Sequence, residues 1–296
     1  MGQKPTLVPR RIWILWLQGL SEAPFIVKKC VSSWVKENPE WEVVVLDSSN
    51  LNQYISLDLP NQSLKQLSLN HRSDLIRVQL LSKYGGIWAD ATAFCVKPLD
   101  DWIDDYTNSG FFAFYKPGRD RIVSSWFIAS SKGCPIVTKL GEQLALFWSK
   151  NTFNINGKLQ RKLRRPLEKA LGVSVITTRL WFSFWVIKLL KIYPYYIFHY
   201  MFERLVSSDR DCQAIWNHTP KISADGPHKI KRLGLFSPID EEIKHDIDTK
   251  RIPVYKLTWK YDPSQYSSAS VLYYLIQGRD CHASHLRELN QAPEAL

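Results

Sequence analysis

Four side chains within residues 71–95 have the types and the spacing to handle a phosphorylated ligand. Asp74 and Arg77 lie three residues apart in a stretch of helical periodicity, so they share one face of the predicted helix. Two glycines end that helix, and Asp90 and Thr92 follow them at the end of an apolar run. A carboxylate beside an acid–base pair is well placed to hold a cation, a hydroxyl group or a phosphate.

A divalent cation is the usual partner of such carboxylates where a diphosphate must be bound or must leave. Mg²⁺ and Mn²⁺ take oxygen ligands, commonly one or two carboxylates together with phosphates of the substrate. Asp90 would supply the carboxylate, which makes it the candidate metal ligand, and Thr92 would add a hydroxyl or a water-mediated contact. Asp74 would hold a ribose hydroxyl, and Arg77 would pair with Asp74, with Asp90 or with a phosphate.

The same residues also have a purely structural interpretation. Asp74 and Arg77 could form a surface salt bridge of little energetic value. Asp90 could be a turn residue after a strand, a place where Asp is common. The two glycines before Asp90 and the small residues after it favour a functional role for this carboxylate.

The strands and helices that must position these side chains can be predicted from the sequence, and their order indicates an α/β fold with a mixed, mainly parallel sheet. Residues 11–17 and 41–47 are apolar runs typical of buried strands, and an amphipathic helix lies between them. This strand–helix–strand order is typical of parallel sheets, which bind ligands at the carboxyl ends of their strands. The other predicted elements are a helix over 73–84, one strand over 87–96, strands at 111–115 and 126–130, and a helix at 135–149.

The composition changes near residue 151 and predicts a division of the chain there. Residues 1–150 would form a nucleotide-binding region, and residues 151–296 a helix-rich region on the acceptor or membrane side that completes the same domain. Residues 158–169 are strongly basic and residues 180–202 are dense in aromatic side chains. They predict a peripheral membrane contact through 158–202. The alternatives are a solvated helix face for the basic run, and a core segment or a wall of the acceptor groove for the aromatic stretch.

The net charge indicates which class of partner the protein binds, and the cysteines indicate its cellular compartment. Lys and Arg number 39 against 28 Asp and Glu, and the net charge of +11 favours anionic partners. No nucleic-acid-binding motif is recognised, so nucleic acid is not expected among them. We expect a cytoplasmic protein, including a peripheral position on the inner face of the cytoplasmic membrane, because the cysteines form no disulfide or zinc pattern. These are Cys30, Cys95, Cys134, Cys212 and Cys281.

The pattern S-D-x-x-R-x-x-x-L-x-x-x-G-G-I-W-x-D-A-T over residues 73–92 resembles the donor-site signature of the capsular polysaccharide synthesis glycosyltransferases. That family is related to the yeast-type initiating mannosyltransferases and to the clostridial glucosylating toxins. The resemblance implies a type-A glycosyltransferase fold and an Asp-x-Asp-like motif that binds Mn²⁺ or Mg²⁺. It continues in residues 11–19, which resemble the first strand of that fold, and in residues 125–131, 194–228 and 254–260.

The resemblance also implies roles for single residues. Trp16 would stack on the nucleotide base, and Asp74 and Arg77 would contact the nucleoside or the sugar. Asp90, as the first Asp of the motif, would be catalytic together with Arg77, whereas Thr92 stands where the second Asp would be and weakens the metal site. Three further residues would contact the acceptor or complete the shell of the metal: Trp126, Asp225 and His228. The structural alternatives are a core position for Trp16 and a helix cap or turn for Asp225 and His228.

The expected reaction is the transfer of a sugar from a UDP- or GDP-sugar to a saccharide or lipid-linked saccharide. The acceptor would be a precursor of a bacterial capsule or of another cell-surface polysaccharide. The related families retain the anomeric configuration, so we expect retention, with the leaving phosphate taking the acceptor's proton in place of a dedicated base. Two alternatives are a non-catalytic basic protein that binds a membrane surface or a polyanion, and a degenerate transferase that binds the donor without turnover.

Overall fold

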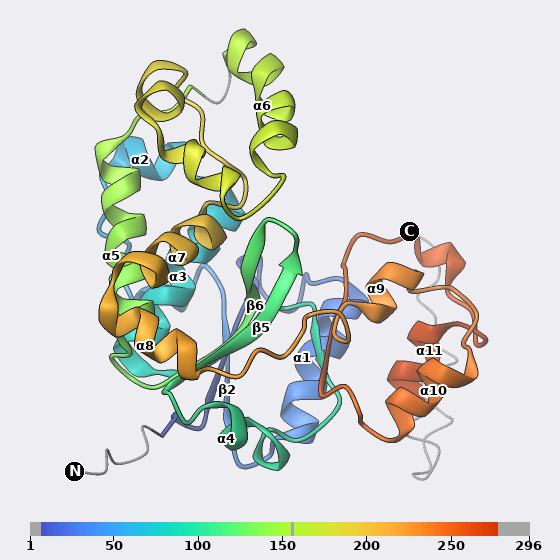
Figure 1. The fold of residues 1–296 in the computed structure, drawn as a ribbon. Helices are drawn as coiled ribbons and strands as arrows, with labels where there is room; N and C mark the ends of the chain where they lie inside the picture. Colours follow the sequence, from blue (N-terminus) through green and yellow to red (C-terminus); the bar gives the residue numbers. More distant parts are fainter. Residues whose placement is uncertain (1–6, 155–156, 278–296) are drawn as a thin grey trace.

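Five strands form the central sheet of the computed structural model, which describes residues 7–154 and 157–277 (Figure 1). The strands are β1 (Arg11–Leu15), β2 (Glu42–Leu46), β3 (Gly86–Ala89), β5 (Phe111–Gly118) and β6 (Arg121–Ser130). Their order across the sheet is β2-β1-β3-β6-β5. β1 pairs in parallel with β2 and β3, whereas β6 pairs antiparallel with β3 and β5.

The predicted α/β class with a mixed sheet and a helix-rich second half is confirmed, although the sheet contains as many antiparallel as parallel pairs. The chain crosses over through helices between β1, β2 and β3, which therefore run parallel. Only residues 119 and 120 separate β5 from β6, so these two strands form a hairpin and must be antiparallel. The parallel part supplies the carboxyl ends at which such sheets bind ligands.

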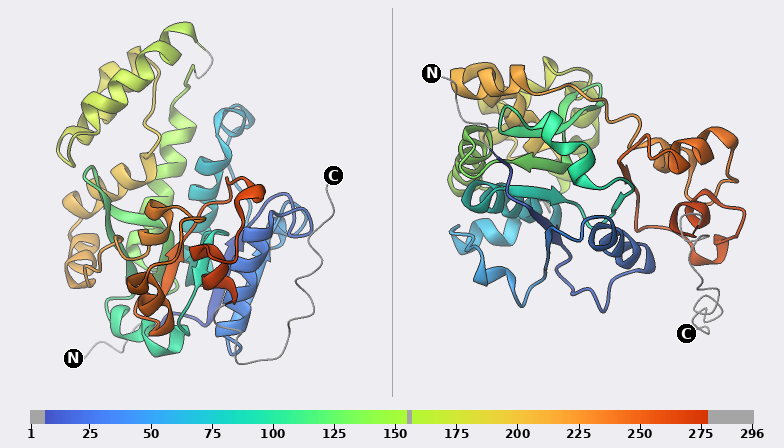
Figure 2. Two further views of the ribbon diagram at one scale, coloured as in Figure 1. Left: turned by 90° about the vertical axis from the view of Figure 1, so that its right-hand side faces the viewer. Right: turned by 90° about the horizontal axis from the view of Figure 1, so that it is seen from below.

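Helices cover both faces of the sheet, as Figure 2 shows from two directions. Alternate residues of β1 point to opposite faces, so Ile12 and Ile14 lie in one core and Trp13 in the other. The core on the side of Trp13 packs against α3 (Leu69–Tyr84), α5 (Pro135–Lys150), α7 (Ile197–Ser208) and α8 (Arg210–His218). The opposite core contains α1 (Phe25–Glu37), β4 (Ala93–Cys95), β7 (Val254–Lys256), α9 (Lys229–Leu233), α10 (Glu241–Asp248) and α11 (Val271–Gln277).

Helix α3 runs directly into the central strand because two glycines follow it. The helix begins after Ser68, whose hydroxyl accepts a hydrogen bond from the His71 backbone N–H, and so starts earlier than predicted. Gly85 and Gly86 have φ angles of 70° and 99°, which favour glycine. A Cβ on Gly86 would lie 2.5 Å from the carbonyl oxygen of Arg11. The glycines therefore let β3 pack against β1.

The prediction of a single strand over residues 87–96 is wrong, because the chain turns at Asp90 and forms two short strands instead. The backbone N–H of Asp90 still donates to the carbonyl of Trp126 at 2.8 Å, whereas the N–H of Ala93 donates back to the carbonyl of Asp90 at 2.7 Å. This tight turn ends β3, and the chain continues as β4, which pairs with β7 in a separate two-stranded sheet. The turn leaves the side chains of residues 90–92 at the carboxyl edge of the central sheet.

Residues 158–192 form a part of the chain that extends away from the sheet in Figures 1 and 2, here called the basic projection. It contains α6 (Lys158–Leu171), η3 (Thr177–Phe182) and η4 (Trp185–Leu189). Trp181, Val186 and Ile192 form a small core together with Tyr200 of α7, and three of the four leucines of α6 pack against it. Among the described residues, none of the helices combines the length and the apolar character that crossing a membrane requires.

The rest of the second half packs on the first half of the chain. α7 contacts β6 and α5, and β7 is hydrogen-bonded to β4; the division at residue 150 stays a prediction. The remaining short elements are η1 (Leu51–Gln53), α2 (Asn61–Gln66), η2 (Leu99–Asp101), α4 (Ile103–Tyr106) and η5 (Pro263–Gln265). Four cysteines are buried and form no disulfide among the described residues, and Cys281 lies outside those residues.

Candidate functional site

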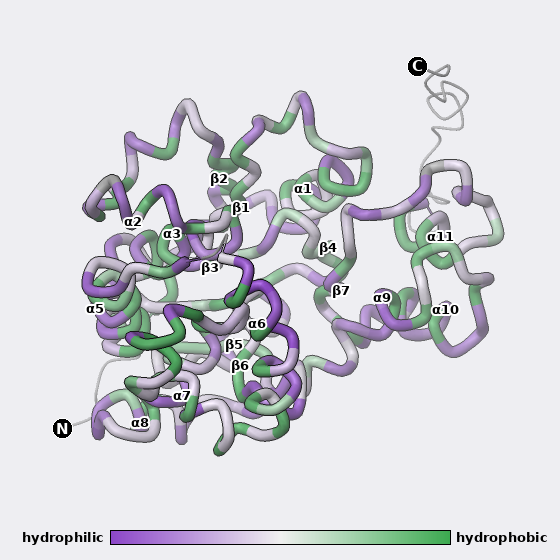
Figure 3. The backbone as a smooth tube through the Cα atoms, turned by 90° about the horizontal axis from the view of Figure 1, so that it is seen from above, coloured by the Kyte–Doolittle hydropathy of each residue, from purple (hydrophilic) through white to green (hydrophobic). Residues whose placement is uncertain are grey.

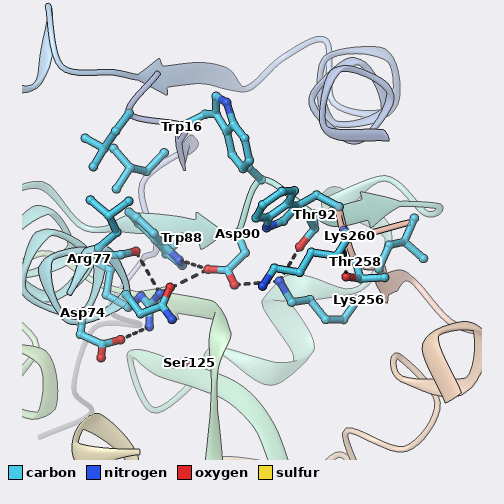
Figure 4. A pocket seen from close by; sticks show the side chains of 18 of the residues that line it. Trp16, Asp74, Arg77, Trp88, Asp90, Thr92, Ser125, Lys256, Thr258 and Lys260 are labelled. Atoms are coloured by element: carbon cyan, nitrogen blue, oxygen red, sulfur yellow. Dashed lines mark hydrogen bonds and ion pairs between the residues drawn. The ribbon is translucent and has the colours of Figure 1, made fainter. Parts of the chain in front are cut away.

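A cleft of about 620 Å³ opens at the carboxyl ends of the parallel strands β1 and β3. All five residues predicted to bind the donor line it, three from strand ends and turns and two from α3 (Figure 4). They are Trp16, Asp74, Arg77, Asp90 and Thr92. The first half of the chain therefore brings these residues together as the sequence predicted, and their roles stay predictions.

Arg77 links the two carboxylates of the cleft. Its Nη1 donates to Asp74 Oδ1 at 2.5 Å, and its Nη2 approaches Asp90 Oδ1 at 3.3 Å. The guanidinium is almost fully buried, and its carbon lies 5.0 Å from the centre of the Trp88 ring and 5.4 Å from that of Phe198. Two aromatic faces and two carboxylates thus fix the position of this cation. The surface salt bridge considered for Asp74 and Arg77 is excluded by this burial.

The two carboxylates have opposite pKa shifts. Burial raises the pKa of Asp74 to about 6, although the guanidinium of Arg77 opposes the shift. Burial also acts to raise the pKa of Asp90, but the nearby charges of Lys256 and Arg77 outweigh it, and the net pKa lies below the ordinary value. Asp90 is therefore a stable anion at neutral pH, held between two cations.

Lys256 enters the cleft from the far end of the sequence and contacts both residues of the predicted metal site. Its Nζ lies 2.8 Å from Asp90 Oδ2 and 2.6 Å from Thr92 Oγ1. Trp88 donates its Nε1–H to Asp90 Oδ1 at 3.0 Å, so both oxygens of this carboxylate have partners within the protein. β7 carries Lys256 to this place because it pairs with β4, directly after the turn at Asp90.

The predicted Mn²⁺ or Mg²⁺ site does not fit the donor set in the cleft. Asp90 is already engaged by Lys256, Arg77 and Trp88, and Asp74 is bound to Arg77. In the part of the chain that the structure describes, no group of three or more His, Cys, Asp or Glu side chains could hold a metal ion. Divalent Mg²⁺ and Mn²⁺ need anionic oxygen ligands, and here the carboxylates serve fixed cations instead.

Aromatic and basic side chains form the rest of the cleft wall. Trp16, at the end of β1, packs edge-to-face on Trp259 with the ring centres 5.9 Å apart, and both rings line the cleft. Trp16 is therefore partly buried yet exposed to a ligand, as a base-stacking residue must be. Lys231 of α9 and Lys260 add two positive charges to the same wall.

Three predicted residues do not line the cleft. Trp126 is buried in β6, where it stacks on Phe114, and it reaches the site only through its carbonyl, which accepts the N–H of Asp90. The His228 ring lies 5.7 Å from the Trp126 ring, and burial lowers the pKa of this histidine to about 4. Asp225 is exposed and forms an ion pair with Arg232 at 2.6 Å.

The sequence predicts no role for several residues of the cleft, although residues 254–260 as a segment carry part of the family resemblance. Lys256, Thr258 and Lys260 come from that segment, and Lys231 lies just beyond the polar loop that contains Asp225. Ser125, the two tyrosines Tyr195 and Tyr196 just before α7, and His199 of α7 also line the cleft. A lysine in a basic protein carries no local signal of its own, so only the pairing of β7 with β4 reveals Lys256.

Comparisons with known proteins give a consistent result. The chain is 28% identical over 183 residues to O-glycosyltransferase braB of Annulohypoxylon truncatum, which covers 55% of this chain and 43% of that protein. It is 30% identical over 159 residues to glycosyltransferase afumC of Aspergillus fumigatus, covering 47% of this chain and 40% of that protein. Both sources are fungi, so the bacterial origin expected from the sequence stays a prediction.

The matched stretch thus spans less than half the length of these two curated relatives. Among solved structures, the PaToxG glycosyltransferase superposes with a TM-score of 0.37 at 14% sequence identity, covering 72% of this chain and 88% of that one. Residues 2–156 and 168–275 match the family described as capsular polysaccharide synthesis protein. This match covers most of the sequence, and the chain therefore belongs to the capsular polysaccharide synthesis protein family.

Proposed function

We propose that the protein transfers a sugar from a nucleotide-sugar donor to a saccharide acceptor. Family membership and the names of the fungal relatives support glycosyl transfer as the reaction. The observation that carries the proposal is the cleft itself, in which Asp90 ends the central strand between two fixed cations and beside an aromatic pair. Such a site suits a ligand with a flat base, a diphosphate and a sugar.

The charges of the cleft suit the departure of a diphosphate. Transfer breaks the bond between the anomeric carbon and the phosphate oxygen, and the electron pair stays on that oxygen. The acceptor hydroxyl forms the new bond to the anomeric carbon, and its proton goes to the departing diphosphate. Arg77 and Lys256 are fixed before the ligand arrives, so they can stabilise the developing charge without reorganisation.

Asp90 serves this arrangement as the anion that holds both cations in place, and Asp74 holds the other side of Arg77. Trp16 and Trp259 would bind the base of a UDP- or GDP-sugar. Retention of configuration, a capsular or other cell-surface precursor as acceptor, and a lipid-linked form of it are further parts of the proposal. Tyr195, Tyr196 and His199 line the side of the cleft next to the basic projection, where an acceptor could enter.

A thermal-shift screen tests the donor. UDP, GDP and their common sugars are added to the wild-type protein and to the Asp90→Asn variant, because a ligand that binds only the folded state raises the melting temperature. We expect a rise with one nucleotide family that is smaller in the variant. No rise with any nucleotide, in a protein shown to be folded, would refute donor binding and favour the basic-protein alternative. Donor binding without any release of nucleoside diphosphate would favour the degenerate transferase.

We also propose that the basic projection binds an anionic membrane surface, with the protein on the cytoplasmic face. α6 carries six basic residues and one acidic residue, and Figure 3 shows both hydrophilic and hydrophobic stretches along it. Large apolar side chains beyond α6 are exposed to solvent, including Ile176 at 75%, Phe184 at 68% and Trp185 at 67%. Cations beside exposed aromatic and aliphatic side chains suit lipid headgroups and the interface beneath them.

The basic projection adjoins the cleft, so a membrane contact through the projection would bring the cleft close to the membrane surface. Tyr196 packs against the core of the projection and also lines the cleft. A membrane-embedded acceptor would therefore meet the donor site at this side of the molecule.

Vesicle sedimentation tests this part of the proposal. Wild-type protein should pellet with vesicles that contain anionic lipid and stay in solution with purely zwitterionic vesicles. Trp185→Ser should weaken the pelleting about fivefold or more, since an interfacial aromatic ring is lost. Val35→Ser on α1 removes an apolar side chain that is 54% exposed and lies outside the projection, and it should have no effect. Equal behaviour of the two variants would contradict the assignment of the projection.

A further inference from the structure

The ammonium of Lys256 occupies the space between the side chains of residues 90 and 92, where the sequence predicted a divalent cation. It donates to Asp90 Oδ2 at 2.8 Å and to Thr92 Oγ1 at 2.6 Å (Figure 4). An ammonium group has three donors and no acceptor. Two of the donors serve these contacts, and the third is left for a ligand in the cleft.

The backbone fixes this lysine on both sides. In the β4–β7 pair Lys256 lies opposite Ala93, and the N–H of Leu257 donates to the carbonyl of Thr92 at 2.8 Å. The N–H of Lys256 itself donates to the carbonyl of Pro227 at 2.8 Å. Its side chain is only 14% exposed. The positive charge is thus positioned by the fold and needs no ligand to order it.

The charges around the cleft leave a surplus that suits a diphosphate. Arg77, Lys231, Lys256 and Lys260 line it together with two carboxylates, Asp74 and Asp90, so two positive charges are in excess. A nucleotide sugar carries one negative charge on each of its two phosphates, which would balance this surplus. A divalent cation would instead add to it, at a place already next to fixed cations.

The surroundings of Lys231 support this interpretation. Burial lowers the pKa of this lysine, and the nearby charge of Lys256 lowers it further. The two ammonium groups therefore repel each other across the cleft wall, and an anion between them would relieve that repulsion.

We propose that Lys256 takes the place of the divalent cation, so that the protein binds the diphosphate of its donor and transfers the sugar without metal. This inference rests on the proposed function, because it concerns the same ligand in the same cleft. As the bond between the anomeric carbon and the phosphate oxygen breaks, the electron pair moves to that oxygen, and the hydrogen bond from Lys256 to the diphosphate strengthens. Lys256 keeps its proton throughout, and the acceptor's proton goes to the leaving diphosphate.

Isothermal titration of the full chain with UDP and with GDP tests the inference. The titrations are run in EDTA and again with Mn²⁺ in excess, and we expect the affinity for the preferred nucleotide to differ less than about twofold between them. Binding that requires Mn²⁺ would overturn the inference and leave the proposed function standing. Binding in neither condition, by folded protein, would overturn both.

Variants of Lys256 separate its charge from its packing. In EDTA, Lys256→Met should weaken nucleotide binding about tenfold or more, because a charge-assisted hydrogen bond to phosphate is lost. Lys256→Arg keeps the charge and should bind within about threefold of wild type. Lys244→Met, an exposed lysine of α10, is the control for the loss of one positive charge. Wild-type affinity in Lys256→Met would overturn the inference, and the wild-type titrations test it even if that variant does not fold.

Discussion

The ion pairs around Asp90 and those around Asp246 use the same kinds of side chain in different surroundings. Asp246 is 3% exposed, and its carboxylate binds Lys229 at 2.6 Å and Arg251 at 3.3 Å. Lys229 also binds Glu242 at 2.7 Å, so this group joins α9 to α10 with two cations and two carboxylates. The group around Asp90 lines a cleft and has cations in excess.

This difference in surroundings indicates that the group around Asp246 is structural and that the group around Asp90 belongs to a binding site. Around Asp246 every charge has an opposite partner, and none of these four residues lines the cleft. Around Asp90 the carboxylates fix the cations, but they do not neutralise all of them. A surplus of positive charge beside an open volume is therefore what marks the cleft as a place for an anion.

The largest effect is expected from Asp90→Asn on turnover. Loss of this carboxylate releases Arg77 and Lys256 from their fixed positions, and we expect the release of nucleoside diphosphate from the donor to fall about a thousandfold. Product release is measured with the preferred nucleotide sugar at saturating concentration. The matched variant Asp246→Asn should keep turnover within about threefold, since its partners lie outside the cleft. Near-normal turnover in Asp90→Asn would remove the functional distinction between the two groups.

The converse prediction concerns stability. Asp246→Ala removes the common partner of Lys229 and Arg251, and the free energy of unfolding should fall by about 2 kcal/mol. The value lies below that of a fully buried pair because water reaches Arg251, which is mostly exposed. Denaturant unfolding followed by circular dichroism measures the change. An unchanged midpoint would show that this group contributes no stability to the contact between α9 and α10.

A pH dependence should distinguish Asp74 from Asp90, whose pKa lies below the ordinary value. Burial raises its pKa to about 6 from an ordinary value of 3.8, so the folded state holds a proton that the unfolded state has lost. The stability contributed by this carboxyl is therefore lost as the pH rises through the folded pKa. Relative to Asp74→Asn, the wild-type free energy of unfolding should fall by about 1 kcal/mol between about pH 5 and about pH 7. A difference that is constant over this interval would contradict the assignment.

The smallest effect is expected at the aromatic wall. Trp16→Leu keeps an apolar side chain at the end of β1 but removes the flat surface, and nucleotide affinity should fall about fivefold. Titration calorimetry measures it, with Trp102→Leu, a buried tryptophan outside the cleft, as the control for a general loss of packing. Equal affinities in wild type and Trp16→Leu would return Trp16 to the core role considered for it from the sequence.

The sequence predicts the part of the site that comes from one continuous segment. Helical spacing places Asp74 and Arg77 on one face, and the two glycines bring Asp90 to the end of β3. Each of these steps depends on local backbone geometry, which residue types express directly. The strands β1 and β2 and the helix between them are predicted for the same reason.

The part that could not be predicted depends on pairing between distant segments. β7 has only three residues, which is too short for a hydrophobic periodicity to predict it. Its pairing with β4 nevertheless places Lys256 beside Asp90. The predicted strand over 87–96 runs past Asp90 because apolar residues lie on both sides of it, although a turn at Asp90 was the alternative. A hydrogen bond to Trp126 decides where the strand ends. Asp225 and His228 were placed near the site by resemblance alone, and the path of their loop keeps both off the cleft wall.

A crystal structure of the full chain with the nucleoside diphosphate that most raises its melting temperature tests the account most directly. We predict that the diphosphate lies within hydrogen-bonding distance of Lys256 and Lys231, with the base against Trp16 and Trp259. A nucleotide bound elsewhere on the molecule, or one whose phosphates do not contact the cations around Asp90, would contradict the account.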